Sequence, residues 1–204
     1  MTDFLDHWLR LADRLSVIAV RIAGAMMLAA ALLVGVDVLL RKAVAITVGG
    51  ADELSGYAFA IGTSWALAFT VLRRANVRID AFYARLPRRI TAVLDLVALL
   101  ALVAFVGYLT WRAVLVLEDS IRFDAHATTP LATPLWIPQS MWIAGFGLFL
   151  FTSAPLIISV ALALTSGDRN KVRRLAGART IEEEAAAEQG TGASLTSADL
   201  LSKR

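Results

Sequence analysis

Apolar and polar positions alternate on a coarse scale, so that four long apolar runs are separated by short polar connections. The runs cover residues 17–40, 54–72, 90–117 and 141–165. A helix needs about 20 apolar residues to cross the hydrocarbon core of a bilayer, and each run is close to that length or longer. The pattern predicts an all-α integral membrane protein with four transmembrane helices, forming one domain over residues 16–165.

Two shorter segments show an amphipathic pattern at helical spacing. In residues 1–15, one helical face carries Phe4, Leu5, Trp8, Leu11, Ala12 and Leu15, and the other carries mostly charged residues. This predicts an interfacial amphipathic helix lying on the membrane. A second short amphipathic helix is expected between spans two and three, where Ile79, Phe82, Tyr83, Leu86 and Ile90 repeat the spacing. Asp80 is placed to cap it.

Composition supports the membrane class over a soluble one. Hydrophobic residues make up 58% of the chain, the mean hydropathy is +0.67 and only 18% of residues are charged, whereas about a quarter are charged in soluble domains. Residues 166–204 are polar and rich in Ala, Glu, Gly and Ser, which predicts a disordered cytoplasmic tail. The chain has no cysteine, which excludes disulfides and thiolate metal sites.

Positive charge is concentrated in the connection between the second and third runs. It contains six arginines against one aspartate, namely Arg73, Arg74, Arg78, Arg85, Arg88 and Arg89 against Asp80. Short connections rich in Lys and Arg stay on the cytoplasmic side, and both chain ends are also basic, so the N- and C-termini are predicted to be cytoplasmic. The arginines either set orientation alone or also contact anionic membrane lipids.

The net charge of +3 is explained by this bias along the chain. A basic protein can attract nucleic acid, but here the basic residues flank membrane spans and set topology. No nucleic-acid partner is therefore predicted.

The second span carries small residues at every fourth position, which are Gly56, Ala60, Ser64 and Ala68. Small residues let another helix approach closely in lipid. The neighbour lies either in this chain or in another subunit. Trp65 lies deeper than the interfacial aromatic belt, so its indole is expected to pack against a helix and to need a hydrogen-bond acceptor; core packing and a subunit contact are both open.

Four ionisable residues fall within the runs, namely Arg21, Asp37, Asp95 and Arg112. Such residues are candidates for function because they are costly in lipid. All four lie near span ends, where long side chains can reach the interface, and Asp37 is placed four residues before Arg41 to form a local ion pair. No charge falls at mid-membrane, which argues against a self-sufficient proton-coupled carrier.

Residues for catalysis or cofactor binding are lacking in the sequence. The two histidines, His7 and His126, lie outside the spans, which excludes bis-histidine haem between the helices. There is no cluster of metal ligands, no glycine-rich phosphate loop and no nucleophile with a nearby base. We therefore expect a protein that is not an enzyme and needs no cofactor.

Several motifs stand out together along the chain. They are Asp52-Glu53-Leu54, Gly62 and Trp65 in the second span, the run from Arg73 through Asn76 to Asp80, Leu86-Pro87, and the later segment from Pro134 to Gln139. In this order and spacing they resemble one family, the small membrane subunit of TRAP (tripartite ATP-independent periplasmic) transporters. Asn76 stands where the family often has histidine.

The resemblance implies a non-enzymatic scaffold in the bacterial inner membrane. It would bind a separate large multi-span subunit, which holds the substrate and sodium sites, and help a periplasmic substrate-binding protein to dock during import of an organic acid anion. Asp52 and Glu53 would lie at the periplasmic mouth of the second span, where they pair with Arg41 or Lys42, pair with a partner, or make no functional contact.

The residues named above as candidates for subunit or lipid contact are Asp52, Glu53, Gly56, Ala60, Ser64, Trp65, Arg73, Arg74, Asn76, Arg78, Asp80, Arg85, Arg88 and Arg89. Two alternatives to the transporter subunit remain at this point. A homo-oligomeric four-span exporter would move solute by itself and depend on Asp37 or Asp95. A membrane anchor or assembly factor would bind a partner without a role in transport.

Overall fold

The computed structural model describes residues 2–74 and 88–166 of the chain. They form four helices, α1 (Thr2–Val44), α2 (Ala51–Leu72), α4 (Arg88–Arg122) and α5 (Trp136–Thr165). Each is long and apolar enough to cross a membrane, which confirms the predicted four-span, all-α architecture. Nearly all of the expected short amphipathic helix before the third span, and all but the first residue of the polar tail, lie outside the described residues.

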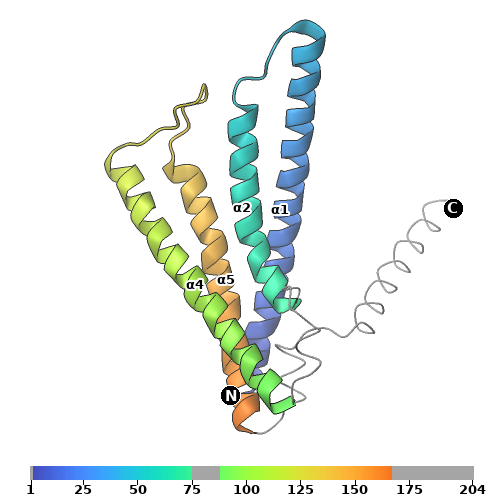
Figure 1. The fold of residues 1–204 in the computed structure, drawn as a ribbon, viewed down its shortest axis with the longest axis vertical. Coiled ribbons are helices and arrows are strands. Elements are labelled where there is room, and N and C mark those ends of the chain that lie inside the picture. The colour runs from blue at the N-terminus through green and yellow to red at the C-terminus, as the bar shows by residue number, and fades with distance from the viewer. Residues whose placement is uncertain (1, 75–87, 167–204) are drawn as a thin grey trace, which may run out of the picture.

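The helices form two antiparallel hairpins, α1 with α2 and α4 with α5 (Figure 1). The start of α1, the end of α2, the start of α4 and the end of α5 lie at the lower end in Figure 1, which we call the near end. Residues 45–50 and 123–135 connect the helices at the opposite end, which we call the far end. The basic connection therefore leaves and re-enters at the end where the described chain begins and stops.

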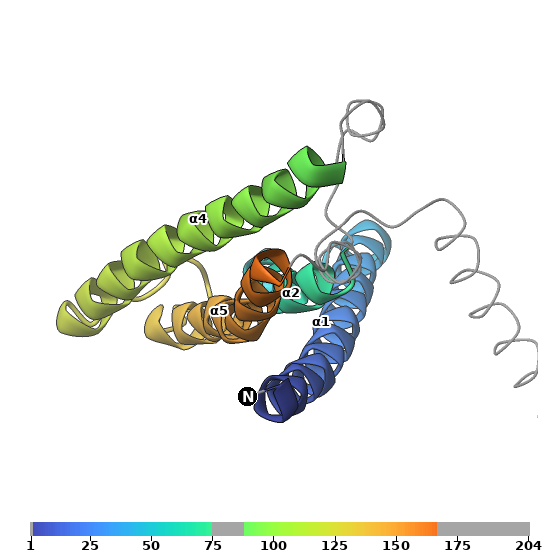
Figure 2. The ribbon, with the colours of Figure 1, turned by 90° about the horizontal axis from the view of Figure 1, so that it is seen from below.

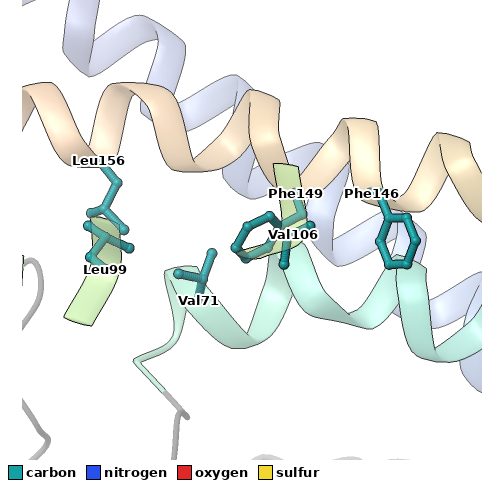
Figure 3. Close-up of a cluster of buried hydrophobic side chains, with 6 residues drawn as sticks. All are labelled: Val71, Leu99, Val106, Phe146, Phe149 and Leu156. Atoms are coloured by element: carbon teal, nitrogen blue, oxygen red, sulfur yellow. The ribbon is translucent and has the colours of Figure 1, made fainter. Parts of the chain in front are cut away.

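α2 and α5 occupy the middle of the arrangement. α2 packs against both α1 and α5, whereas α4 packs mainly against α5; viewed along the bundle, α4 is an outlying rod on one side and α1 lies on the other (Figure 2). The main apolar cluster joins α2, α4 and α5 through Val71, Leu99, Val106, Phe146, Phe149 and Leu156 (Figure 3). α5 supplies three of these six residues, so it is the central packing element.

The first helix differs from expectation, because α1 runs without a break through the predicted boundary between residues 15 and 17. No proline or glycine occurs before Gly24, and the Ser16 hydroxyl bonds within the helix to the Asp13 carbonyl (2.8 Å). The face expected to lie on lipid is partly covered by protein, since Ala12 is fully buried and the Trp8 ring lies 5.6 Å from that of Phe151 in α5.

All four helices extend beyond the apolar runs at the far end, and α4 and α5 extend furthest. α5 begins at Trp136 rather than near residue 141, and α4 continues to Arg122. Pro138 lies in the first turn of α5, where the missing N–H has no intrahelical partner to lose. Hydropathy marks the part of a helix that suits lipid, whereas helix ends depend on backbone hydrogen bonds, so the helices are longer than the apolar runs.

Candidate functional site

A buried carboxylate at the far end ties the second helix to the connection between the last two helices. Glu53, in the first turn of α2, is only 9% exposed. One of its oxygens accepts a hydrogen bond from the Tyr57 hydroxyl (2.8 Å), and the other accepts one from the Thr129 hydroxyl. Thr133 lies beside the same carboxylate. Glu53 therefore fixes the 123–135 connection against α2.

This arrangement corrects the expectation for the acidic pair. Glu53 is buried and bound to hydroxyl groups, and Arg41, one of the two basic residues that were candidate partners beside Lys42, pairs with Asp37. A contact of Asp52 with a partner subunit stays a prediction. Asp52 is exposed. Adjacent helical residues point in directions about 100° apart, so only one of the two carboxylates can face the connection.

A second buried carboxylate fixes the other far-end connection. Asp37 is 2% exposed and accepts hydrogen bonds from Arg41, from the Thr47 hydroxyl (2.8 Å) and from the Val48 backbone N–H (2.6 Å). The ion pair with Arg41 was expected from the spacing, and the two bonds to the 45–50 connection were not. A buried charge is stable only when it is paired and hydrogen-bonded, and three donors meet that need.

The two far-end connections touch each other. Gly50 has a φ of +90°, a conformation that glycine adopts readily and other residues rarely do. A side chain at Gly50 would overlap that of Leu131, and Gly49 lies against Pro130. The 123–135 connection is closed by backbone bonds from Ala127 to Thr133 and from Leu135 to Ala125 (both 3.0 Å). Together, residues 45–53 and 123–135 form a continuous surface, which we call the far-end platform.

Close packing of α2 on α5 uses two of the predicted candidates. The Trp65 indole N–H donates to the Met141 carbonyl (2.8 Å), which supplies the acceptor that was expected for this half-buried indole. A Cβ at Gly145 would come within 2.7 Å of the Ser64 carbonyl carbon, so the glycine is what allows the two helices to approach. Ser64 and Trp65 therefore contact a helix of this chain.

Some of the remaining small residues of α2 are buried against other helices of this chain, and others are exposed. Ala68 is fully buried, whereas Gly56 is exposed with open space around it and Ala60 is half-buried. Gly62, one of the residues that carry the family resemblance, lies against Met27 of α1. The small-residue ridge is thus covered by this chain at its near-end half and open at its far-end half.

At the near end, one arginine of the basic connection binds within the chain. Arg73 pairs with Asp13 of α1 (3.0 Å), and its guanidinium lies 5.2 Å from the Phe69 ring centre. Both charged side chains are nearly half exposed, so the pair contributes little stability by itself. Arg74 is half-buried.

The other candidates in this connection are not placed by the structure. Asn76, Arg78, Asp80 and Arg85 lie outside the described residues, and Arg88 and Arg89 begin α4 without described side chains. Any lipid or subunit contact of these residues stays a prediction.

The four charges within the spans fall into two groups. Asp37 and Asp95 are buried, whereas Arg21 and Arg112 are exposed, and the Arg112 guanidinium lies 5.9 Å from the Trp111 ring centre. Exposed arginines near span ends fit the expected extension towards the interface. Within the described ranges, no three His, Asp or Glu side chains come together as a metal site would require.

Four membrane-spanning helices, packed through a central α2–α5 contact and joined by fixed far-end connections, define a small integral membrane component. Residues 30–163 match the model of the DctQ component of tripartite ATP-independent periplasmic transporters. The match covers 134 of the 204 residues, and the chain belongs to this family, the small membrane subunits of TRAP transporters. No curated protein and no solved structure matches the chain.

Several residues of the site were missed by sequence reasoning. Thr129, Thr133 and Gly145 carry no motif, and their partners lie far away in the chain. Gly145 offered one usable signal, because glycine lowers helix stability and is therefore informative inside a long helical run. The two threonines offered none beyond their place in the third connection.

Proposed function

We propose that this chain is the fixed scaffold of a sodium-gradient-driven transporter that imports an organic acid anion. It binds a separate large multi-span subunit, which carries the substrate and sodium sites, and the far-end platform forms part of the surface on which a periplasmic substrate-binding protein docks. The protein resides in the bacterial inner membrane with its near end in the cytoplasm.

The observation that carries this proposal is the far-end platform. The buried carboxylates of Asp37 and Glu53 each accept hydrogen bonds from one connection and hold it in place. The two connections meet at Gly50 and Leu131. A docking surface held in one conformation costs less ordering entropy on binding than a mobile one. Exposed apolar side chains at this end, such as Leu131 and Trp136, offer contact area for a protein partner.

Exposure of the outer helices supports a partner within the membrane. In the most apolar 18-residue windows, 11% of residues are buried in α1 and 17% in α4, against 44% in α5. The outer faces of α1 and α4 therefore meet lipid or another protein. A large subunit seated on one of them would leave the α2–α5 contact unchanged, as a static scaffold requires.

The exporter alternative is less well supported. It needs an ionisable residue that changes partners as solute moves, but Asp37 is bound by Arg41, Thr47 and Val48 in an arrangement that holds a connection. The anchor alternative accounts for exposed helices but gives no use for a fixed far-end platform.

The test is uptake of a labelled organic acid anion under a sodium gradient, in cells that keep the large subunit and the binding protein. Deleting this chain is expected to abolish uptake, and restoring it to recover uptake. Unchanged uptake after deletion would refute the proposal. Solute flux by the purified chain alone, lost in Asp37→Asn or Asp95→Asn, would instead support the exporter.

The partner is tested separately by purifying the tagged chain in mild detergent from its native membrane. We expect one large polytopic protein to co-purify at equal stoichiometry. Recovery of this chain alone would contradict the scaffold, whereas a stable complex without sodium-dependent uptake would identify an anchor.

A further inference from the structure

Four basic side chains lie on one face of the near-end half of α1. At about 100° per residue, His7, Arg10, Arg14 and Arg21 fall within about 60° of one another around the helix, and all four are exposed. We call this set the basic ladder. It lies outside residues 30–163, so the match to the family does not account for it.

The ladder faces away from the rest of the described chain. Buried residues on the same half of α1 are Leu5, Ala12, Ser16, Ala19 and Ala23, and their mean direction is about 180° from that of the ladder at the same helical spacing. Trp8, on the packed side, contacts Phe151 of α5. The ladder therefore meets whatever surrounds the protein at this depth.

Acidic groups of the described chain do not neutralise the ladder. Asp13, at the edge of this half of α1, pairs with Arg73, which leaves it engaged at the end of α2. Asp6 is exposed at the flank of the ladder, one turn before Arg10. By the same spacing Asp3 also falls on this face. Three guanidinium groups against the carboxylates of Asp3 and Asp6 still leave the face positive.

Depth in the membrane distinguishes this face from an ordinary solvated one. His7, Arg10, Leu11 and Arg14 line a shallow hollow at the near end, whereas Arg21 lies about 10 Å further along the helix, within the apolar run. Side chains on a helix tilt towards its N-terminus, so Arg21 can extend towards the hollow. An arginine at this depth needs a polar or anionic partner.

We propose that the basic ladder binds the headgroup of an anionic phospholipid in the near-end leaflet. Guanidinium groups form paired hydrogen bonds with phosphate oxygens, and the exposed apolar residues Leu11, Ile18 and Ile22 beside the ladder provide a surface for an acyl chain. Apolar and basic positions on neighbouring parts of one face fit a molecule that has both an anionic head and an apolar tail.

The experiment is native mass spectrometry of the purified full-length chain, titrated with phosphatidylglycerol or with zwitterionic phosphatidylcholine. The test variant is Arg10→Gln/Arg14→Gln/Arg21→Gln. The control, Lys42→Gln/Arg112→Gln/Arg122→Gln, removes the same charge from exposed positions elsewhere. Each cation near an anionic lipid surface changes affinity about fivefold, so we expect a preference for phosphatidylglycerol of at least about tenfold in the wild type and the control, lost in the test variant.

Helix content measured by circular dichroism shows whether the variants fold. If the triple Gln variant does not fold, Arg10→Lys/Arg14→Lys/Arg21→Lys retains the charge and is expected to keep a preference reduced severalfold, because an ammonium cannot bind phosphate in the paired geometry. Equal loss in the control would show a net-charge effect and overturn the site, as would a full preference in the test variant. Unchanged lipid binding with loss of the co-purifying membrane protein would make the ladder a protein interface instead.

Discussion

At the scale of single residues, Glu53 and Asp37 show how a buried charge can organise a connection between helices. Each carboxylate lies near a helix end, is nearly inaccessible, and accepts hydrogen bonds from residues of a connection. Removing such a carboxylate breaks two or three hydrogen bonds at once, each with a net value of about 0.5–1.5 kcal/mol. The far-end platform should therefore be sensitive to single substitutions.

Glu53→Ala is expected to lower the free energy of unfolding by about 1–2 kcal/mol, because the hydrogen bonds from the half-buried Tyr57 and from Thr129 to the carboxylate are both lost. Thermal unfolding in detergent measures the loss. Local opening of the 123–135 connection should also speed tryptic cleavage after Arg122, which is exposed at its start. Glu53→Gln keeps one carbonyl acceptor, so its stability should lie between that of the wild type and that of Glu53→Ala.

Asp52→Ala is the matched control for this prediction. Asp52 is the neighbouring acidic residue, has an exposed side chain, and should change stability by no more than about 0.5 kcal/mol. Equal effects at the two positions would show that burial of Glu53 contributes nothing.

Local interactions were predictable from sequence and distant ones were not. The Asp37–Arg41 pair spans four residues and follows from helical geometry. The bonds from Thr129 to Glu53 and from Trp65 to Met141 each join residues 76 apart. The need of Trp65 for an acceptor was foreseeable, but its identity depended on how α5 lies against α2.

At the scale of elements, the α2–α5 contact depends on one glycine. Gly145→Ala would place a Cβ 2.6 Å from the Trp65 ring and 2.7 Å from the Ser64 carbonyl carbon, so the helices must separate. We expect a loss of about 1–3 kcal/mol of stability, measured as a lower unfolding temperature of the variant. The same shift should weaken the bond from Trp65 to Met141.

Gly147→Ala, two residues further along the same helix, is the matched control. A Cβ at Gly147 has nothing within 4 Å, and alanine favours a helix over glycine by about 1 kcal/mol. Stability should stay the same or rise. A comparable loss in both variants would mean that helix flexibility, rather than close approach, sets the requirement at position 145.

Helix α1 shows why the boundaries of elements were harder to predict than their existence. The four apolar runs were long enough to be unambiguous, and four helices are found. The amphipathic pattern of residues 4–15 favoured a helix on the membrane surface, but the same pattern suits a helix that packs its apolar face on α5. Hydrophobic periodicity shows which face is covered and leaves open whether lipid or protein covers it.

At the scale of the whole molecule, four antiparallel spans place the described chain's first and last residues at the same end as the end of α2 and the start of α4, between which the basic connection lies in the sequence (Figure 1). Arginine-rich connections resist transfer across the membrane, so we expect the near end in the cytoplasm and the far-end platform in the periplasm. Because the chain contains no cysteine, single cysteines can report this orientation without background labelling. Thr128 and Asp6 are exposed positions at the far and near ends.

In spheroplasts, a membrane-impermeant maleimide should label Thr128→Cys at once and Asp6→Cys only after the membrane is permeabilised. Ser166→Cys lies at the near end, just after α5. It should behave like Asp6→Cys, because an even number of spans separates the two positions. Labelling of both Asp6→Cys and Ser166→Cys from outside would show the opposite orientation. The far-end platform would then lie in the cytoplasm, where a periplasmic binding protein could not reach it. Labelling of only one of the two from outside would contradict the four-span topology itself.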